Sequence, residues 1–341
     1  MRKRGNRIRR KTVRRTVISA ALGCTAILGA VLAFSMGLHM GSPEQETAVE
    51  PALLTAGPRQ LTVHVPEKKE RPVPSFSFPT IYSPAAILVR EEDGAVLAHK
   101  NADQAVYPAS LTKVMTCILA IEKLGDLDQT VTLPESMFYR LYDENASMAG
   151  FQPNETVKAI DLLYGVLLPS GAECCIGLAE KIAGSESAFA DMMNQKAAEL
   201  GMDKTHFVNT TGLHDEKHVS SVRDLAVLLQ YAMQNETFRE IFTSSQYLSG
   251  TTDQHPEGLM IWSNVFGYVG YPAEVTGGEL LGGKTGYTSE AGLCLASAAK
   301  VQGEDYLLVT VGAQGSTWPY PPHILDALTV YNALGKELGK S

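Results

Sequence analysis

Residues 107–123 read YPASLTKVMTCILAIEK, with a serine three positions before a lysine where an apolar helical pattern begins. Positions i and i+3 share one helical face, so the Ser110 hydroxyl and the Lys113 amine are expected within contact range. The start of a helix favours an oxyanion and, together with burial, lowers the pKa of a lysine toward that of a usable base. The pair is a candidate nucleophile with its base. For Ser110 alone, an ordinary helix N-cap is the alternative.

The Ser-x-x-Lys spacing is not specific by itself, because residues 297–300, SAAK, repeat it. There the pattern is that of a strand, in which i and i+3 point to opposite faces. Two further stretches strengthen the first copy. LLPSGAECC at 167–175 places Ser170 at a turn between helices, and GGKTGYTSEAG at 282–292 places Lys284 and a hydroxyl on a strand. A lysine and a hydroxyl at a strand edge can hold a substrate carboxylate.

Apolar periodicity predicts an α+β domain. Residues 85–100, AAILVREEDGAVLAHK, place two apolar runs around Asp93-Gly94, which is a strong β-hairpin signal. Later, Ser220 and Asp224 are typical of a capped helix start. A strand pair, a block of helices, three strands and a last helix suit an antiparallel sheet with helices against it. The expected helices span 110–124, 160–183, 186–200, 221–234 and 323–338, and the expected late strands span 280–288, 292–301 and 306–314.

The N-terminal region differs from the rest in charge. Of the 29 Lys and Arg residues, nine lie in the first fifteen positions, which hold no acid, although the whole chain has a formal net charge of −8. An acidic body repels a phosphate backbone, so nucleic-acid binding is not expected. Residues 16–38 are uncharged and, as a helix rising ~1.5 Å per residue, would span the ~30 Å hydrocarbon core. We expect a basic cytoplasmic segment, 1–15, and a transmembrane anchor, 16–40. A cleaved signal peptide is the alternative, and either would export the rest.

The chain after the anchor divides into a linker and a folded domain. Residues 41–82 contain repeated prolines and no sustained apolar period, which predicts an extended, Pro-rich stalk before a domain over 83–341. The five cysteines are too few for a disulfide framework and are expected to be buried. The segment HDEKH at 214–218 lacks a glutamate directly after its first histidine, as a zinc-protease helix would need. No metal and no cofactor are expected.

The order Ser-x-x-Lys, internal Ser, Lys-Thr-Gly is that of penicillin-binding proteins and class A β-lactamases. From about residue 82 to 315 the chain resembles the D-alanyl-D-alanine carboxypeptidases among the low-molecular-mass penicillin-binding proteins. The implied fold is β-lactamase/transpeptidase-like, an antiparallel sheet with a helical cluster. Five ordered stretches carry the resemblance: AAILVREEDGAVLAHKNAD, YPASLTKVMT, DLLYGVLLPSGAE, FVNTTGLHDEKHVSSVRDLAVLL and GGKTGYTSEAGLCLASA.

The resemblance implies a serine D,D-carboxypeptidase that removes the terminal D-alanine of peptidoglycan stem peptides. It would act outside the cytoplasm, in the cell membrane, tethered by the single N-terminal helix. Ser110 would attack the carbonyl of the penultimate D-alanine, and Lys113 would take its proton. Ser170 would assist proton transfer to the departing D-alanine. β-Lactams would acylate Ser110 and remain attached.

The same resemblance gives the Lys-Thr-Gly strand a role in substrate binding. Lys284 and Thr285 would bind the terminal carboxylate. Gly286 would let the substrate backbone approach the strand edge closely. The backbone N–H of Tyr287 would form the oxyanion hole together with that of Ser110.

The second motif departs from the family, where it usually reads Ser-x-Asn. The third residue here is Ala172, which has no amide to bind substrate or steady the lysines. Glu173 is adjacent, but one helical step turns a side chain by about 100°, so we do not expect it to substitute. An impaired penicillin-binding or wall-sensing protein is therefore an alternative. A β-lactamase is a further one, for which no deacylating glutamate is evident.

Overall fold

The computed structural model describes residues 71–340. The predicted basic segment, the predicted anchor and residues 41–70 of the predicted linker lie outside the described residues. Within 71–340, no helix is both long and apolar enough to cross a membrane.

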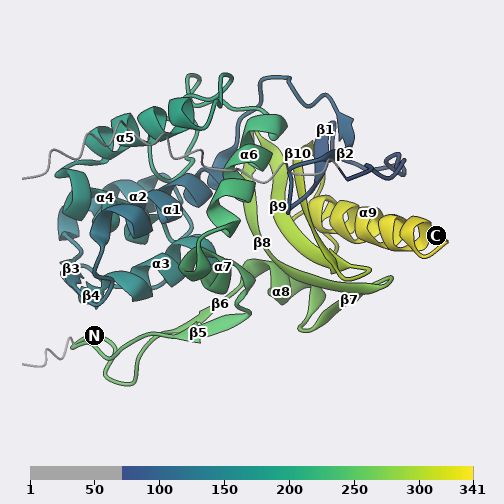
Figure 1. Ribbon diagram of the computed structural model, residues 1–341. Coiled ribbons are helices and arrows are strands. Elements are labelled where there is room, and N and C mark those ends of the chain that lie inside the picture. Colours follow the sequence, from purple (N-terminus) through teal and green to yellow (C-terminus); the bar gives the residue numbers. More distant parts are fainter. Residues whose placement is uncertain (1–70, 341) are drawn as a thin grey trace, which may run out of the picture. The chain divides into compact units, whose positions relative to one another are not determined.

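One six-stranded antiparallel sheet forms the centre of the domain, in the order β2-β1-β10-β9-β8-β7 (Figure 1). The helices α1 to α7 lie on one side of it and α9 on the other. The prediction of an antiparallel sheet with helices packed against it is confirmed. The strands are β1 (Ala85–Arg90), β2 (Val96–Lys100), β7 (Ala273–Val275), β8 (Gly278–Thr288), β9 (Gly292–Val301) and β10 (Glu304–Ala313).

The first two strands form the predicted hairpin. Gly94 adopts φ +72°, which a residue without a Cβ reaches without strain, and its N–H donates to the Arg90 carbonyl at 2.9 Å. The Asp93 carboxylate accepts from Ala95 N and from the Arg90 guanidinium. The turn is thus fixed by the two residues that predicted it.

The near-continuous apolar run of β1 arises because both faces of the sheet are covered. Ile87 and Val89 pack into the core under the helical block, whereas Leu88 packs into a second core with α9. Alternate side chains of a strand point to opposite faces, so both sets must be apolar when both faces are buried. Tyr331 of α9 (Pro322–Leu338) is fully buried in the second core.

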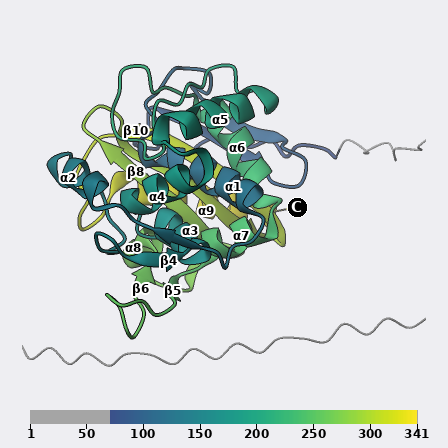
Figure 2. The same ribbon diagram turned by 90° about the vertical axis from the view of Figure 1, so that its left-hand side faces the viewer.

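The helical block surrounds α1, which contacts α3, α4, α5, α6 and α7. Figure 2 views this layer from the helical side, with α1 and α4 amid the other helices. The four cysteines of the described part are buried and free, as expected. The helices of the block are α1 (Lys113–Leu124), α2 (Glu135–Asp143), α3 (Ala159–Leu167), α4 (Ala172–Ala183), α5 (Glu186–Glu199), α6 (Val222–Met233) and α7 (Glu236–Thr243).

The structure corrects several sequence expectations. The helix expected over 160–183 breaks at Pro169, giving α3 and α4. The cap of α6 is Ser221, whose side chain accepts from Asp224 N at 3.1 Å, rather than Ser220. Several elements of three to nine residues were not predicted, because so short a segment carries little periodicity. They are α2, α7, α8 (Asn264–Val269), β7 and the pairs β3 (Thr130–Thr132) with β4 (Thr156–Lys158) and β5 (Gln246–Leu248) with β6 (Met260–Trp262).

Residues 71–82, which fall in the predicted linker, contact the domain. Arg71 forms ion pairs with Glu92 and Glu304. Phe76 and Phe78 pack against the core on the α9 side. These twelve residues therefore lie against the fold as extended chain without a helix or strand of their own.

Candidate active site

The predicted nucleophile lies on a single turn of 3₁₀ helix, Ala109–Thr112, which leads directly into α1 at Lys113. The Lys113 amine Nζ is 3.1 Å from Ser110 Oγ. Ser110 is partly exposed, whereas Lys113 is buried. The structure thus joins the two residues that the i, i+3 spacing predicted, and it leaves the hydroxyl accessible.

Burial lowers the pKa of Lys113, although the negative charge of nearby Glu173 opposes this. The amine also donates to the Thr211 carbonyl at 2.5 Å. A neutral amine that donates to a carbonyl keeps a lone pair for another partner. Lys113 can therefore accept the Ser110 proton, which is the role of a general base.

The Thr211 carbonyl is held in place by its own loop. Asn209 Oδ1 accepts from Gly212 N at 2.7 Å and from Thr211 N at 3.2 Å. Gly212 adopts φ +78°, and a Cβ there would lie 1.9 Å from the Ala109 carbonyl oxygen. Only glycine fits so close to the nucleophile turn. The sequence signal was FVNTTGL, but neither the Asn209 bonds nor the carbonyl contact could be deduced from it.

Strand β8 supplies the opposite wall. A Cβ on Gly286 would lie 3.0 Å from Ser110 N, so the strand backbone passes directly beside the nucleophile. The Tyr287 side chain is exposed and lines the cavity. Lys284 is buried and donates to the Thr285 carbonyl at 2.7 Å. Burial and the positive charge of Lys113 lower the pKa of Lys284 well below its ordinary value.

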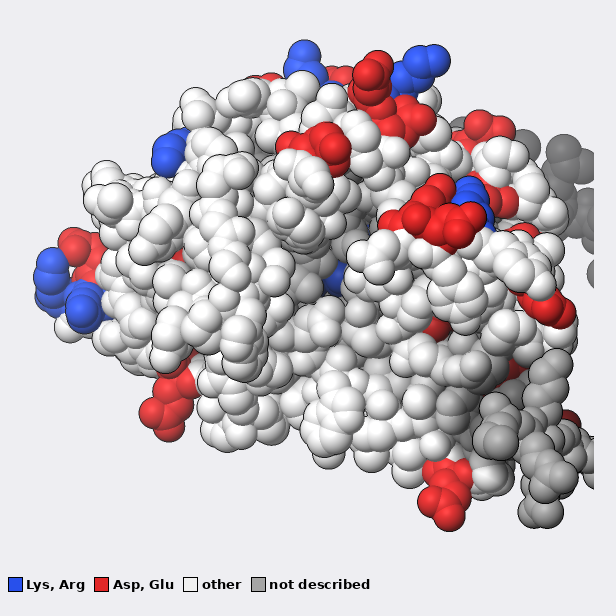
Figure 3. All heavy atoms as spheres, turned by 180° about the vertical axis from the view of Figure 1, so that it is seen from behind, with Lys and Arg blue, Asp and Glu red and all other residues white. Residues whose placement is uncertain are grey.

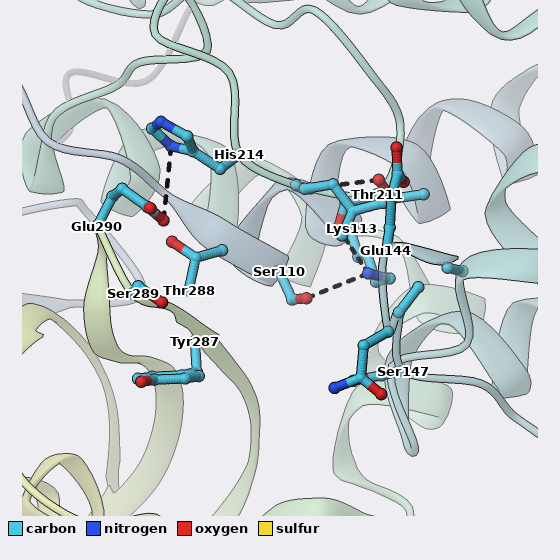
Figure 4. Close-up of a pocket in the computed structure, with 15 residues that line it drawn as sticks. Ser110, Lys113, Glu144, Ser147, Thr211, His214, Tyr287, Thr288, Ser289 and Glu290 are labelled. Atoms are coloured by element: carbon cyan, nitrogen blue, oxygen red, sulfur yellow. Dashed lines mark hydrogen bonds and ion pairs between the residues drawn. The ribbon is translucent and has the colours of Figure 1, made fainter. Parts of the chain in front are cut away.

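Ser110 and Lys113 face a cavity of about 430 Å³. In Figure 4 the Ser110–Lys113 contact lies at its centre, with Tyr287, Thr288 and Ser289 on one side and Glu144 and Ser147 on the other. Figure 3 shows a hollow with a basic side chain at its floor, mostly uncharged walls and acidic side chains near its edge. A cavity of this volume can hold part of a peptide.

The family follows from comparison with known proteins. Residues 72–315 match the family described as Peptidase_S11, D-alanyl-D-alanine carboxypeptidase. This chain belongs to that family.

Individual relatives agree with this membership. The D-alanyl-D-alanine carboxypeptidase DacF of Bacillus subtilis (strain 168) is 34% identical over 67% of this chain and 57% of its own length. The D-alanyl-D-alanine carboxypeptidase of Streptomyces sp. (strain K15) is 29% identical over 76% of this chain and 90% of its own. The crystal structure of the Streptomyces K15 DD-transpeptidase superposes with a TM-score of 0.66 at 28% identity, covering 76% of this chain and 98% of that one. The chain thus spans little more than half the length of DacF.

The second family motif is built differently from the first. Ser170 is buried at φ +73°, a conformation that is uncommon for a residue with a Cβ. Its Oγ has no hydrogen-bond partner among residues 71–340 and does not line the cavity. Ala172 does line the cavity. The structure therefore does not link Ser170 to Ser110 or Lys113 by a hydrogen bond, and its proton-transfer role stays a prediction.

Glu173 does not occupy the place of the missing amide. Its Oε1 accepts from Ala149 N at 2.6 Å and Gly150 N at 2.9 Å, so the carboxylate turns toward that loop. Burial raises the pKa of Glu173, while these backbone donors and Lys113 oppose the shift. The reasoning from helical rotation was correct for this side chain.

Several cavity residues were not predicted to belong to the active site; His214 was considered only as a metal ligand. His214 Nδ1 lies 3.9 Å from Glu290 Oε2 at the rim (Figure 4). Thr288 ends the Lys-Thr-Gly strand β8 and Ser289 and Glu290 follow it, so their place beside that motif was the available signal. Glu144 and Ser147 follow α2, a helix that was not predicted. Among residues 71–340, no group of three His, Cys, Asp or Glu side chains is placed to hold a metal.

Proposed function

We propose that this chain is a serine D,D-carboxypeptidase that removes the terminal D-alanine from peptides ending in D-Ala-D-Ala. The observation that carries the proposal is the Ser110–Lys113 contact beside the bare backbone of Gly286, at the floor of an open cavity. Family membership supports the same reaction. Peptidoglycan stem peptides are the proposed natural substrates, and β-lactams the proposed inhibitors.

The first half-reaction forms an acyl-enzyme. Lys113 accepts the proton of Ser110, and Oγ attacks the carbonyl carbon of the penultimate D-alanine. The tetrahedral oxyanion is held by the backbone N–H groups of Ser110 and Tyr287, each worth about 3 to 4 kcal/mol in typical acyl-transfer sites. Lys284 and Thr285 would hold the terminal carboxylate. For Lys284 this requires its amine to turn from the Thr285 carbonyl toward the substrate.

Departure of D-alanine completes the acyl-enzyme. The C–N bond breaks as the proton taken up by Lys113 passes to the leaving amine, with Ser170 as the proposed relay, and free D-alanine departs. In the second half-reaction, water attacks the ester on Ser110 and one of its protons returns to Oγ, which restores the hydroxyl and releases the shortened peptide. Each step uses groups of this chain, the substrate and one water molecule.

A second candidate follows from Ala172. Without a side-chain amide at this position, the protein would acylate but turn over slowly, which suits a penicillin-binding or wall-sensing role. A β-lactamase is the less favoured function, because a β-lactamase hydrolyses its acyl-enzyme rapidly and no deacylating glutamate is evident in this sequence.

One paired experiment separates these functions. The purified full-length protein is given diacetyl-lysyl-D-alanyl-D-alanine while a parallel sample receives a fluorescent penicillin. Release of free D-alanine together with labelling is the expected result. Labelling without release would favour the sensing role, and rapid loss of the label with penicillin hydrolysis would favour a β-lactamase.

The predicted anchor makes the location of the enzyme a separate proposal. An uncharged segment at 16–38 behind a basic arm would hold the catalytic domain outside the cytoplasm, on the cell membrane. A reporter fused after Ser341, active only outside the cytoplasm, should be active and sediment with membranes. Recovery of active reporter in the soluble exported fraction would instead indicate a cleaved signal peptide.

A further inference from the structure

A buried histidine contacts the nucleophile turn but does not line the cavity. Thr112 is the residue between Leu111 and Lys113, and its side chain is fully buried. Its Oγ1 lies 2.8 Å from His218 Nε2. His218 is 1% exposed and does not line the cavity. Its hydrogen bond to the nucleophile turn is made through Thr112.

The direction of this hydrogen bond is determined by the other ring nitrogen. The backbone N–H of Val208 donates to His218 Nδ1 at 3.1 Å. A nitrogen that accepts a hydrogen bond carries no proton, so in the neutral ring the proton is on Nε2. Burial lowers the pKa of His218 to about 4, so the ring is neutral near pH 7. His218 thus donates to Thr112, and Thr112 accepts.

The histidine is itself held by its own segment. His206 and Val219 exchange two backbone hydrogen bonds, at 2.8 and 3.0 Å, and His218 N donates to the Asp215 carbonyl at 2.9 Å. The Phe207 ring packs edge-on against the imidazole, with centroids 5.6 Å apart. The imidazole therefore has a fixed position and a fixed tautomer, which a support for another residue requires.

The same segment contacts α1 at two further points. The Thr210 carbonyl accepts from Thr116 Oγ1 at 2.7 Å, and the Thr211 carbonyl accepts from Lys113 Nζ at 2.5 Å. Thr112 is thus the third contact, and it lies closest to Ser110 in the sequence. A displacement of about 1 Å in a catalytic group can cost on the order of 10²-fold in rate.

We propose that His218 is a positioning residue for the acylation step: its bond to Thr112 holds the turn that keeps Ser110 Oγ within reach of Lys113 Nζ. The inference rests on the proposed function. The inference goes beyond the proposed function because it assigns a role to His218, which lies outside the three motifs. The positioning role requires that Nε2 of His218 donate to Thr112. The bond that Nδ1 accepts from Val208 is not required for it.

Two substitutions distinguish the hydrogen bond at Nε2 of His218 from the one at Nδ1. A glutamine amide nitrogen reaches roughly the place of Nε2, whereas an asparagine amide oxygen reaches roughly that of Nδ1. His218→Gln therefore keeps a donor for Thr112, and His218→Asn keeps an acceptor for Val208. We expect His218→Gln to retain kcat within about threefold and His218→Asn to lose about 10- to 100-fold with little change in KM. The acylation rate constant with a fluorescent penicillin should fall in parallel.

A double-mutant cycle and a matched control complete the test. Thr112→Val should reproduce the loss, Thr112→Ser should avoid it, and His218→Asn should add little on the Thr112→Val background. His323→Asn makes the same change at another buried histidine, on α9 beyond the sheet, and should leave the acylation rate of folded protein unchanged. Rates are expressed per folded molecule, measured by circular dichroism.

The positioning role is refuted if His218→Asn and His218→Gln acylate alike, or if His218→Asn loses only thermal stability, as His323→Asn would. It is also refuted if the two losses in the cycle add in full. Because acylation by penicillin is the readout, the test stands even if the wild-type protein releases no D-alanine, an outcome that would refute only the proposed carboxypeptidase.

Discussion

Ser110 and Ser170, the serines of two family motifs, each lie on a tight turn. The two turns differ in the hydrogen bonds that surround the serine. Each has a residue with a Cβ at positive φ: Ala109 at +46° before Ser110, and Ser170 itself at +73°. Around Ser110, the base is hydrogen-bonded to both the nucleophile and a main-chain carbonyl. Around Ser170, the buried hydroxyl has no partner among the described residues, and Ala172 has no amide.

The difference separates nucleophilic attack from departure of the leaving group. The groups for nucleophilic attack are in contact before any substrate binds, whereas the proposed relay for the leaving group is not. A buried hydroxyl without a protein partner costs about 1 to 3 kcal/mol, and a hydrogen bond to the leaving amine would offset this cost. The account therefore predicts that attack by Ser110 is well supported and that departure of the leaving group, and with it turnover, is limited at the second motif.

The largest expected effect comes from removing the nucleophile. Ser110→Ala should lower D-alanine release by at least about 10³-fold and abolish covalent penicillin labelling, because it removes the hydroxyl that contacts the base Lys113. Both are measured on protein of unchanged circular dichroism. Labelling that survives would place the nucleophile elsewhere.

The next effect concerns the base and its pH dependence. Below its pKa, Lys113 is protonated and cannot accept the Ser110 proton, so the acylation rate should fall as pH falls. Because burial lowers that pKa, the transition should lie below the ordinary lysine range. Lys113→Gln should cost about 10²- to 10⁴-fold and remove this pH limb. An unchanged limb in Lys113→Gln would show that another group titrates.

Substitution of Ser170 is expected to slow release of D-alanine more than acylation by a β-lactam. Ser170→Ala should slow D-alanine release by about 10²-fold or more, as loss of a proton-transfer group typically does, and slow acylation by a β-lactam less. Steady-state release and rapid-mixing acylation are measured on the same preparation. Equal losses in both would show that Ser170 serves the nucleophile turn as well, and the contrast between the turns would then fail.

The smallest expected effect is a gain at the second motif. Ala172→Asn should raise turnover by about 2- to 10-fold, which corresponds to one net hydrogen bond of about 0.5 to 1.5 kcal/mol. Ala172→Leu has similar bulk without the amide and serves as the matched control. If the asparagine variant is no faster than the leucine variant, the missing amide does not limit turnover.

The sequence predicted the parts of this site that depend on local geometry. The Ser110–Lys113 contact follows from helical spacing, and the Lys-Thr-Gly strand follows from its pattern. The supporting contacts come from far along the chain: Thr211 is 98 residues from Lys113, and His218 is 106 from Thr112. They involve carbonyls and loop side chains, which leave no periodic signal.

The burial and the contacts of individual polar side chains could not be predicted from the sequence. Lys284 was expected to bind a substrate carboxylate; its amine is buried and donates to the Thr285 carbonyl, and the binding role stays a prediction. Glu173 was correctly excluded from the Ala172 position, yet its bonds to Ala149 and Gly150 depend on a loop after the unpredicted helix α2. In each case the tertiary environment, rather than the residue type, decided what the side chain contacts.

The central claim is that Ser110 carries the acyl group. Full-length protein is trapped with a penicillin, digested, and the modified peptide is sequenced by mass spectrometry. The account predicts one adduct, on Ser110, that is absent from Ser110→Ala and present in Ser170→Ala. An adduct on any other residue, or none at all, would contradict it.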